Sequence, residues 1–218
     1  MPEKKNITKT KLVIFDYDGV LVDTLAITIR AYNHLLRDLN LSKQFTKDEF
    51  KDYCESDWIS GLSKIGLHKK EEQQKCAEFY FRYLKDYGHE IQLCPGIKKM
   101  LEKLKQKGYS LAIASNNKFD EIKTRLLDKE IDNYFDYIID DTHGLKPNPA
   151  GILALLAHLN IKPEHAVLVG DMDGDMLAAK NANLKKAIGV TWGYHHPEKL
   201  NCADIIIDSP EELIDVVD

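Results

Sequence analysis

The sequence predicts an α/β fold, a doubly wound parallel sheet with an all-helical subdomain inserted after the first strand. Two observations lead to this prediction. After residue 95, short apolar segments alternate with helix-like segments, which is typical of a parallel sheet covered by helices. Between Gly19 and Pro95, by contrast, 75 residues intervene without a convincing strand, whereas a crossover between parallel strands needs only about a dozen.

Six short segments are predicted to be strands. The first, residues 11–15 (KLVIF), is an apolar run that ends abruptly at Asp16, as expected of a strand buried on both faces. The others are similarly short and apolar, and helix-like stretches separate most of them. These are residues 110–114, 136–140, 166–170, 186–190 and 203–208.

Helices are predicted between several of these strands. One opens at Pro95-Gly96 and continues to Gly108, with Pro near its start and Gly past its end. A second follows Pro149 and carries leucine and isoleucine residues over an arc wide enough for burial. The last is capped by Ser209.

The segment between Gly19 and Pro95 has a helical pattern of its own. Apolar residues recur at i, i+3, i+4 and i+7 over residues 22–39. Thr46 and Glu49 have the spacing of a capping box, and residues 69–87 form a further helical segment. We therefore predict a helical cap domain at residues 22–92, and an α/β core domain formed by residues 1–21 and 93–218.

Composition excludes several classes of protein. Thirty Lys and Arg face 35 Asp and Glu, a net charge of −5, without the dense basic run that a nucleic-acid-binding surface needs. No apolar stretch approaches the ~20 residues of a membrane helix, and the first residues lack the pattern of a signal peptide. Four cysteines lie far apart without a CxxC pair. We expect a cytoplasmic protein with reduced thiols and no nucleic-acid or membrane partner.

The informative polar residues follow the ends of predicted strands. In an open parallel sheet, ligands bind beyond the carboxyl ends of the strands, where the strand order reverses. The sequence therefore brings carboxylates, an amine and a hydroxyl into one crevice. The residues are Asp16 and Asp18 after the first strand, Ser115, Asn116 and Asn117 after the second, Lys146 after the third, and Asp171 and Asp175 after the fourth.

Such a group of carboxylates predicts a divalent cation. Left alone, the carboxylates would repel one another and raise one another's pKa. Mg²⁺ suits oxygen ligands in octahedral geometry, with water and a substrate phosphate completing the shell. A calcium loop at residues 171–175 is the alternative, but the EF-hand pattern requires Gly at its sixth position and Glu at its twelfth. Met176 and Ala182 stand there instead.

Four motifs in order carry a family resemblance. They are DYDGVLVDT (16–24), ASNN (114–117), KPNP (146–149) and GDMDGD (170–175). Through them the chain resembles, over nearly its whole length, the haloacid dehalogenase (HAD) superfamily of phosphohydrolases, in the branch with a helical cap after the first strand of a Rossmann-like core. Residues 191–200 and 203–213 are similar to the end of phosphoglycolate-phosphatase-like members.

The resemblance implies a role for each motif residue. Asp16 would be the nucleophile that forms an aspartyl-phosphate, and Asp18 the general acid and base. Ser115, with Asn116 and the backbone N–H groups beside it, would hold the substrate phosphate, and Lys146 would neutralise both nucleophile and phosphate. Mg²⁺ would be held by Asp16, the backbone carbonyl of Asp18 and Asp171, with Asp175 supporting it through water or through Lys146.

The same resemblance favours a phosphatase acting on a small phosphorylated metabolite, with phosphoglycolate as the first guess. Dehalogenating members carry Tyr at the position of Asp18, and phosphonate-cleaving members carry a small residue. The alternatives are a phosphomutase of the β-phosphoglucomutase type, a receiver-like signalling module, and a phosphate-binding pseudo-enzyme. We expect a monomer or homodimer.

Two further residues stand out near the end of the chain. At Asn183 the family usually has Gly, and Asn is the next best residue for a left-handed backbone. The pair His195-His196 could suggest a metal site, but adjacent side chains point apart in an extended chain and no third ligand is evident. We expect these histidines to lie in a polar loop.

Overall fold

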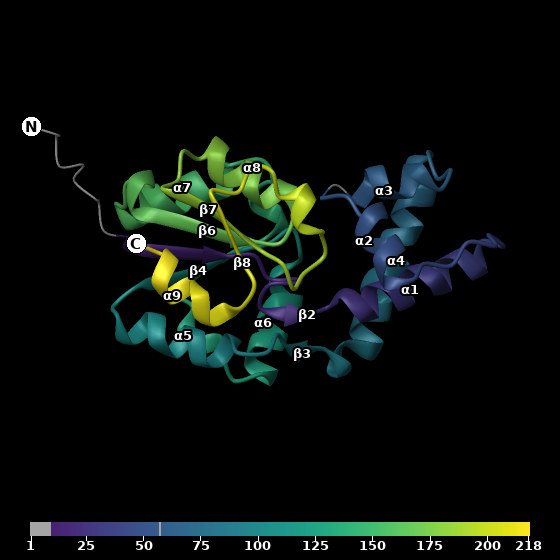
Figure 1. Ribbon diagram of the computed structural model, residues 1–218. Coiled ribbons are helices and arrows are strands. Elements are labelled where there is room, and N and C mark those ends of the chain that lie inside the picture. The colour runs from purple at the N-terminus through teal and green to yellow at the C-terminus, as the bar shows by residue number, and fades with distance from the viewer. Residues whose placement is uncertain (1–9, 57) are drawn as a thin grey trace, which may run out of the picture.

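The computed structural model describes residues 10–56 and 58–218 (Figure 1). Its main sheet has six parallel strands, and every predicted strand is confirmed within two residues at each end. The bounds are β1 (Leu12–Phe15), β4 (Ser110–Ala114), β5 (Tyr137–Ile139), β6 (Ala166–Gly170), β7 (Lys186–Val190) and β8 (Ile205–Ile207).

The strand order is β5-β4-β1-β6-β7-β8, so β1 lies inside the sheet between β4 and β6. Its register places Phe15 opposite Ile113 on one side and Val169 on the other. The chain moves outward from β1 to β4 and β5 and then returns to build β6, β7 and β8. The order therefore reverses at β1, and the crevice for a ligand is expected at the carboxyl end of this strand.

Helices cover both faces of the sheet, which confirms the doubly wound prediction (Figure 1). Alternate residues of β1 pack to opposite sides: Val13 and Phe15 against one group of helices, Leu12 and Ile14 against the other. The first group is α5 (Ile97–Gln106), α6 (Phe119–Asp128) and α9 (Leu213–Val216), and the second is α7 (Ala150–Leu159) and α8 (Asp173–Asn181). Short 3₁₀ turns span Gly88–Glu90, Asp132–Tyr134, Asp141–His143, Pro163–His165, Pro197–Lys199 and Pro210–Glu212.

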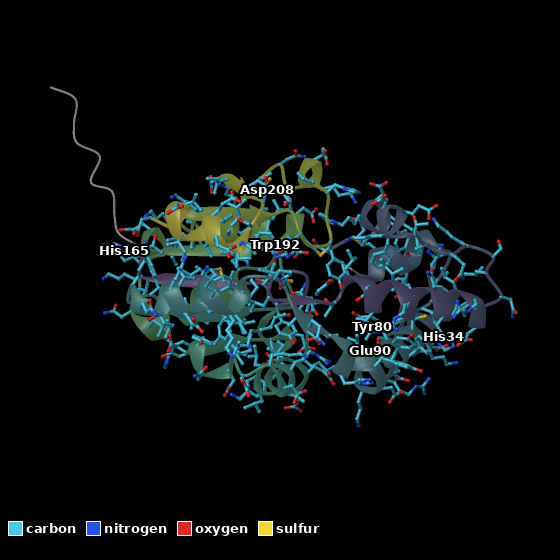
Figure 2. The ribbon with its side chains drawn as sticks, turned by 60° about the horizontal axis from the view of Figure 1, so that its bottom comes forward. His34, Tyr80, Glu90, His165, Trp192 and Asp208 are labelled. Atoms are coloured by element: carbon cyan, nitrogen blue, oxygen red, sulfur yellow. The ribbon has the colours of Figure 1, made fainter. Side chains whose placement is uncertain are left out.

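The insertion after β1 is helical, as predicted. It contains α1 (Leu25–Asp38), α2 (Lys47–Tyr53), α3 (Trp58–Lys64) and α4 (Lys70–Tyr87). The predicted capping box is present, because the Glu49 N–H donates to Thr46 Oγ1 and the Thr46 N–H donates to Glu49 Oε2. These helices lie together at one end of the sheet (Figure 1). In Figure 2, His34 and Tyr80 lie on this helical part, whereas His165, Trp192 and Asp208 lie on the core.

A short antiparallel pair joins the two parts and was not predicted. It consists of β2 (Val22–Asp23) and β3 (Gln92–Leu93), with Val22 opposite Leu93. Val22 was expected in a helix, and no strand was expected here; both expectations were wrong. Two-residue strands are too short to produce a periodic signal. The pair lies at the predicted domain boundary, and residues 1–9 of the predicted core domain lie outside the described residues.

The end of α8 confirms the expectation for Asn183, whose φ of 53° is left-handed. Within residues 10–56 and 58–218, no helix is both long and apolar enough to cross a membrane.

Candidate active site

The first site residue follows β1 directly. Asp16 is buried, and its N–H donates to the Val169 carbonyl of the neighbouring strand, which fixes the start of the loop. The chain then turns at Gly19, whose φ is +81°. A Cβ there would lie 2.3 Å from Asp171 Oδ2. Glycine is needed both for this backbone conformation and for the close approach of the loop to Asp171.

Lys146 lies between two carboxylates. Its ammonium nitrogen is 2.6 Å from Asp16 Oδ1 and 2.6 Å from Asp175 Oδ1, and all three side chains are at most 9% exposed. The Asn116 side chain holds the backbone of this lysine: its Oδ1 accepts from the Lys146 N–H at 2.7 Å, and its Nδ2 donates to the Lys146 carbonyl at 3.4 Å. Segments that follow β1, β4 and β6 therefore position the ammonium group of Lys146.

Three of the predicted metal ligands meet beside this lysine. Asp16, Asp171 and Asp175 each contribute an oxygen, and these oxygens lie within 4.8 Å of one another. Burial raises the pKa of Asp16 to about 7, against the lowering effect of Lys146. Burial, with the charges of Asp16 and Asp175, raises the pKa of Asp171 well above its usual value. The arrangement concentrates negative charge where water is excluded.

The hydrogen bonding of Asp171 fits a cation. Its Oδ2 accepts from the Tyr194 N–H at 2.5 Å, but its Oδ1 is buried without a hydrogen-bond partner among the described residues. Buried polar atoms are nearly always satisfied. Three neighbouring carboxylates, one of which has an unpaired buried oxygen, suit a hard divalent cation, so these residues could hold Mg²⁺.

Asp18 lies apart from the three-carboxylate group and has a different environment. Its Oδ2 accepts from the Asn117 side-chain amide at 3.2 Å, while its Oδ1 is buried with no partner in the part of the chain that the structure describes. Burial raises the pKa of this carboxyl group. A raised pKa favours the protonated form of the carboxyl group, which can donate its proton to a reacting group.

Ser115 stands at the end of β4 and is buried. Its Oγ accepts from the Asn117 N–H at 3.1 Å and shapes the loop that leads to α6. The backbone N–H of Asn116, the residue that follows Ser115, has no acceptor among the described residues. A free N–H beside a hydroxyl and an ammonium is a suitable donor for a phosphate oxygen.

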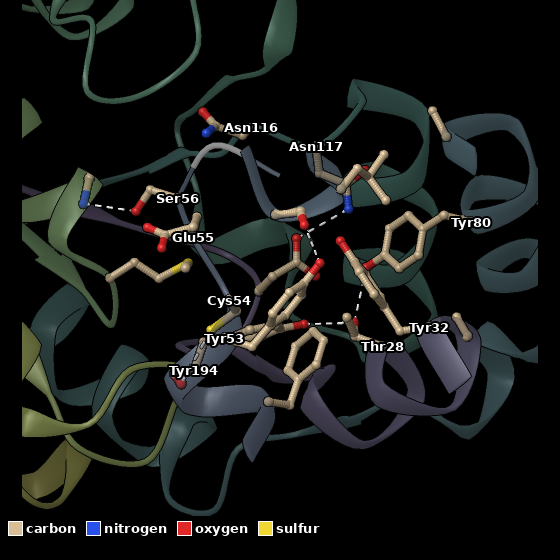
Figure 3. Close-up of a pocket in the computed structure, with 18 of the residues that line it drawn as sticks. Thr28, Tyr32, Tyr53, Cys54, Glu55, Ser56, Tyr80, Asn116, Asn117 and Tyr194 are labelled. Carbon is tan, nitrogen blue, oxygen red and sulfur yellow. Dashed lines mark hydrogen bonds between the residues drawn. The ribbon is translucent and has the colours of Figure 1, made fainter. Parts of the chain in front are cut away.

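All these groups except Asp171 line one cavity of about 210 Å³ (Figure 3). The core forms its floor and the helical insertion covers it. Figure 3 shows Tyr32, Tyr53 and Tyr80 around the space next to Asn117, with Cys54, Glu55 and Ser56 along one side. The predicted site residues are therefore brought together at the carboxyl ends of β1, β4 and β6, beneath the insertion.

Sequence reasoning missed several residues that complete the site. Asn117 was quoted in a motif without a role, although it contacts Asp18. Ser56 Oγ donates to Asp173 Oδ1 at 2.5 Å and joins the insertion to α8. The motif position of Asn117 could have indicated its role, whereas no sequence signal pairs Ser56 with Asp173.

His195 lies in the loop after β7, as expected, but its side chain is buried. It is only 1% exposed. The Asp173 N–H donates to its Nδ1 at 3.3 Å, so Nε2 carries the proton and donates to the Cys54 carbonyl at 3.2 Å. Burial lowers the pKa of this imidazole and favours its neutral form. The residue therefore connects the core to the insertion as a buried structural histidine.

Comparison with known proteins agrees with this geometry. A sequence model of the haloacid dehalogenase-like hydrolase family matches residues 13–189, which include every predicted site residue. The chain belongs to this family. The predicted resemblance is thereby confirmed, as is the prediction of a phosphoric monoester hydrolase of the HAD type.

Curated relatives align over nearly the whole chain. A phosphoglycolate phosphatase of Aquifex aeolicus is 33% identical over 95% of this chain and 97% of its own. A pyrophosphatase PpaX of Listeria innocua is 28% identical over 96% and 97%. Among solved structures, a haloacid dehalogenase-like hydrolase from Streptococcus pneumoniae has a TM-score of 0.84 at 24% identity, covering 96% of this chain and 99% of its own. This structural similarity shows that the two chains share a fold.

Proposed function

We propose that this chain is a Mg²⁺-dependent phosphatase that hydrolyses a small phosphorylated metabolite through an aspartyl-phosphate on Asp16. The observation that carries this proposal is the Lys146 ammonium, which lies 2.6 Å from the Asp16 carboxylate in the wall of the cavity. A phosphate dianion and a carboxylate repel each other, so positive charge is needed where they meet. Membership of the hydrolase family supports the same chemistry.

In the first step an oxygen of Asp16 attacks phosphorus, and the bond from phosphorus to the alcohol oxygen of the substrate breaks. Asp18 gives its proton to that oxygen, so a neutral alcohol leaves. The burial that raises the pKa of Asp18 supports this assignment. Ser115 and the Asn116 N–H hold a phosphoryl oxygen, and Lys146 neutralises the approaching charges.

In the second step Asp18 is ionised and takes a proton from water. The water oxygen attacks phosphorus while the bond from phosphorus to Asp16 breaks, so inorganic phosphate forms and the carboxylate is restored. The Asn117 amide, which donates to Asp18 Oδ2 at 3.2 Å, keeps this carboxyl group oriented in both steps.

We propose that Mg²⁺ is bound by Asp16, by the backbone carbonyl of Asp18 and by Asp171. Asp175 would support these ligands through water or through Lys146. The buried, unpaired Oδ1 of Asp171, which has no partner within the described residues, supports this assignment. When bound, the cation supplies positive charge that offsets the repulsion between phosphate and carboxylates.

The names of relatives indicate which substrates to assay first. Phosphoglycolate follows from the Aquifex aeolicus relative, and inorganic pyrophosphate from the Listeria innocua relative. A β-phosphoglucomutase-type reaction would return the phosphoryl group to a sugar, and product analysis with a sugar 1-phosphate separates the two reactions. We further propose that residues 22–92 act as a cap domain on the core, and that the chain is a monomer or homodimer.

The test is phosphate release from a panel of phosphorylated metabolites and from p-nitrophenyl phosphate, with Mg²⁺ or with a chelator. Asp16→Asn should lower kcat by more than about 10³-fold, because the amide is a poor nucleophile. Asp128→Asn is the matched control, since this carboxylate is exposed at the end of α6 and does not line the cavity. Activity of Asp16→Asn within tenfold of the wild type, or full activity without a divalent cation, would contradict the proposal.

A further inference from the structure

We propose that the cavity of this chain selects phosphate monoesters whose alcohol part is uncharged and apolar, and disfavours substrates with a second anionic group. This inference rests on the proposed phosphatase function and assigns its substrate class. It disfavours phosphoglycolate, with its carboxylate, and pyrophosphate, with its second phosphate.

The walls above the phosphate site are mainly aromatic and aliphatic. Helix α1 contributes Tyr32 and Leu35, α2 contributes Phe50 and Tyr53, and α3 and α4 contribute six further apolar side chains. The Tyr32 ring packs edge-to-face against the Tyr53 and Tyr80 rings, with ring centres 6.2 Å and 6.4 Å apart (Figure 3). Such walls gain contact with a flat or branched apolar group and offer little to an anion. The α3 and α4 residues are Leu62, Cys76, Ala77, Phe79, Tyr80 and Phe81.

The charges of the lining residues also disfavour a substrate with a second anionic group. Among the described lining residues, Lys146 is the only basic one, and it already pairs with Asp16 and Asp175 at the catalytic end. The remaining charged residue on the side of the insertion is Glu55, an acid. A distal carboxylate or phosphate would leave water without a cation to pair with.

Three basic residues near the cavity do not provide a cation for a distal anionic group. Lys64 forms an ion pair with Glu55. Lys118 lies over the Phe81 ring, with its Nζ 4.5 Å from the ring centre. The Arg125 guanidinium donates to the Gly88 carbonyl at 2.7 Å and to Glu121 at 3.1 Å. None of the three lines the cavity.

Most of the wall hydroxyls are also engaged. Tyr53 donates to the Gly61 carbonyl, and the Tyr80 hydroxyl lies 3.0 Å from Thr28 Oγ1. The Tyr32 hydroxyl has no hydrogen bond to any residue that the structure describes, and the ring lines the cavity. One free hydroxyl can bind a neutral oxygen of the substrate, but it cannot neutralise an anion.

The test compares two esters that differ by one distal carboxylate, benzyl phosphate and 4-carboxybenzyl phosphate, in the wild-type protein with Mg²⁺. Their leaving groups are similar because the carboxylate is remote from the reacting oxygen. We expect kcat/KM for benzyl phosphate to be higher by about tenfold or more, since a buried unpaired charge is strongly rejected. Phosphoglycolate should fall on the disfavoured side as well.

A charge added to the wall should change this preference. Ala77 is a half-buried lining residue of α4, and Arg and Gln are both good helix formers. Ala77→Arg should reduce or reverse the preference for benzyl over 4-carboxybenzyl phosphate. Ala77→Gln, the neutral control with a long polar side chain, should keep it. The ratio of two substrates on each variant cancels differences in the amount of folded protein.

Binding of non-hydrolysable analogues separates this inference from the proposed function. Benzylphosphonate should bind the Mg²⁺-loaded protein about tenfold or more tightly than phosphonoacetate, whether or not any ester is turned over. Preference for benzylphosphonate without turnover of any monoester would support the inference and overturn the proposed function. Turnover with equal or better use of phosphoglycolate and 4-carboxybenzyl phosphate would overturn the inference and leave the phosphatase standing.

Discussion

The hydroxyl oxygens of Thr28 and Tyr194 lie 2.7 Å apart, although 166 residues separate them in the chain. Thr28 belongs to α1 of the insertion, and Tyr194 belongs to the loop after β7 in the core. The backbone N–H of the same tyrosine donates to Asp171 Oδ2 at 2.5 Å. One residue therefore contacts both the helices above the cavity and a carboxylate of the proposed metal site.

Tyr194→Phe removes the hydroxyl but keeps the ring and the backbone N–H. The Thr24 and Thr28 side chains would lose this buried partner, so we expect the free energy of unfolding to fall by about 1–2 kcal/mol. Binding of Mg²⁺ should be preserved. Tyr134→Phe is the control, because that hydroxyl bonds an exposed glutamate and its loss should cost less than about 0.5 kcal/mol. Equal losses in urea unfolding would contradict this account.

Asn116→Ala should lower kcat without unfolding the protein. The Asn116 amide bonds both the N–H and the carbonyl of Lys146, so its loss frees the lysine backbone to shift. Misplacement of a reacting group by about 1 Å can cost on the order of 10²-fold in rate. The check is steady-state kinetics on p-nitrophenyl phosphate together with a thermal unfolding curve.

The matched control for that variant is Asn181→Ala. Asn181 also bonds the Lys146 loop, donating from its side chain to the Pro147 carbonyl at 3.0 Å, but it is exposed and outside the cavity. We expect kcat close to the wild-type value. If both variants lose activity equally, general loosening of the loop explains the effect, and Asn116 has no special part in positioning Lys146.

Much of the architecture could be predicted from the sequence, for identifiable reasons. A strand buried on both faces, such as residues 12–15, is apolar throughout, and the first polar residue, Asp16, marks its end. Parallel strands place all their carboxyl ends on one edge, so Asp16 and Lys146 could be expected to meet although 130 residues separate them. The end of each strand can be recognised from the local sequence, and the parallel arrangement of the strands brings the residues that follow them into one site.

The features that escaped prediction depend on contacts between distant surfaces. The link from Thr28 to Tyr194 joins two hydroxyls, and nothing in either local sequence indicates the partner. The burial of His195 depends on the position of α2, because its Nε2 bonds the Cys54 carbonyl at the end of that helix. The apolar lining of the cavity likewise arises from four helices, and only their packing shows which residues face inward.

The stability of the metal-free protein should depend on pH. Burial raises the pKa of Asp16 from 3.8 to about 7, so between about pH 4 and pH 7 the folded protein holds a proton that the unfolded chain releases. Stability falls as pH rises wherever the folded state binds more protons. The free energy of unfolding should therefore fall through this window, by up to about 1.4 kcal/mol per pH unit for one proton.

Urea unfolding in the presence of a chelator measures this dependence. The pH should run from about 4.5 to about 7.5, which covers most of that window. Asp16→Asn removes the titrating carboxyl group and should make the dependence shallower. Asp128→Asn, which removes an exposed carboxylate at the end of α6, should keep the wild-type slope. A metal-free wild type that becomes more stable between pH 5 and pH 7 would contradict the prediction. Added Mg²⁺ should stabilise most at the upper end of the range, where the carboxylates are ionised.

The effect of Asp18→Asn should depend on the leaving group. The amide can neither give a proton to the departing oxygen nor take one from water. An alkyl phosphate needs the proton in the first step and should lose about 10²–10⁴-fold in rate. An activated aryl phosphate such as p-nitrophenyl phosphate needs little proton donation, so its first step should still proceed. The second step then lacks its base, and the aspartyl-phosphate should accumulate.

Rapid quenching followed by mass spectrometry detects that intermediate. Asp18→Asn mixed with the aryl ester should carry one phosphoryl adduct at Asp16, and the doubly substituted Asp16→Asn, Asp18→Asn protein should carry none. Asn117→Ala removes the amide that orients Asp18 and leaves the carboxyl group in place. It should therefore slow both steps and accumulate less adduct than Asp18→Asn. Blocked turnover of Asp18→Asn without an adduct would show that the first step itself needs this residue even for an activated ester, and that its carboxyl group is not merely the base of the second step.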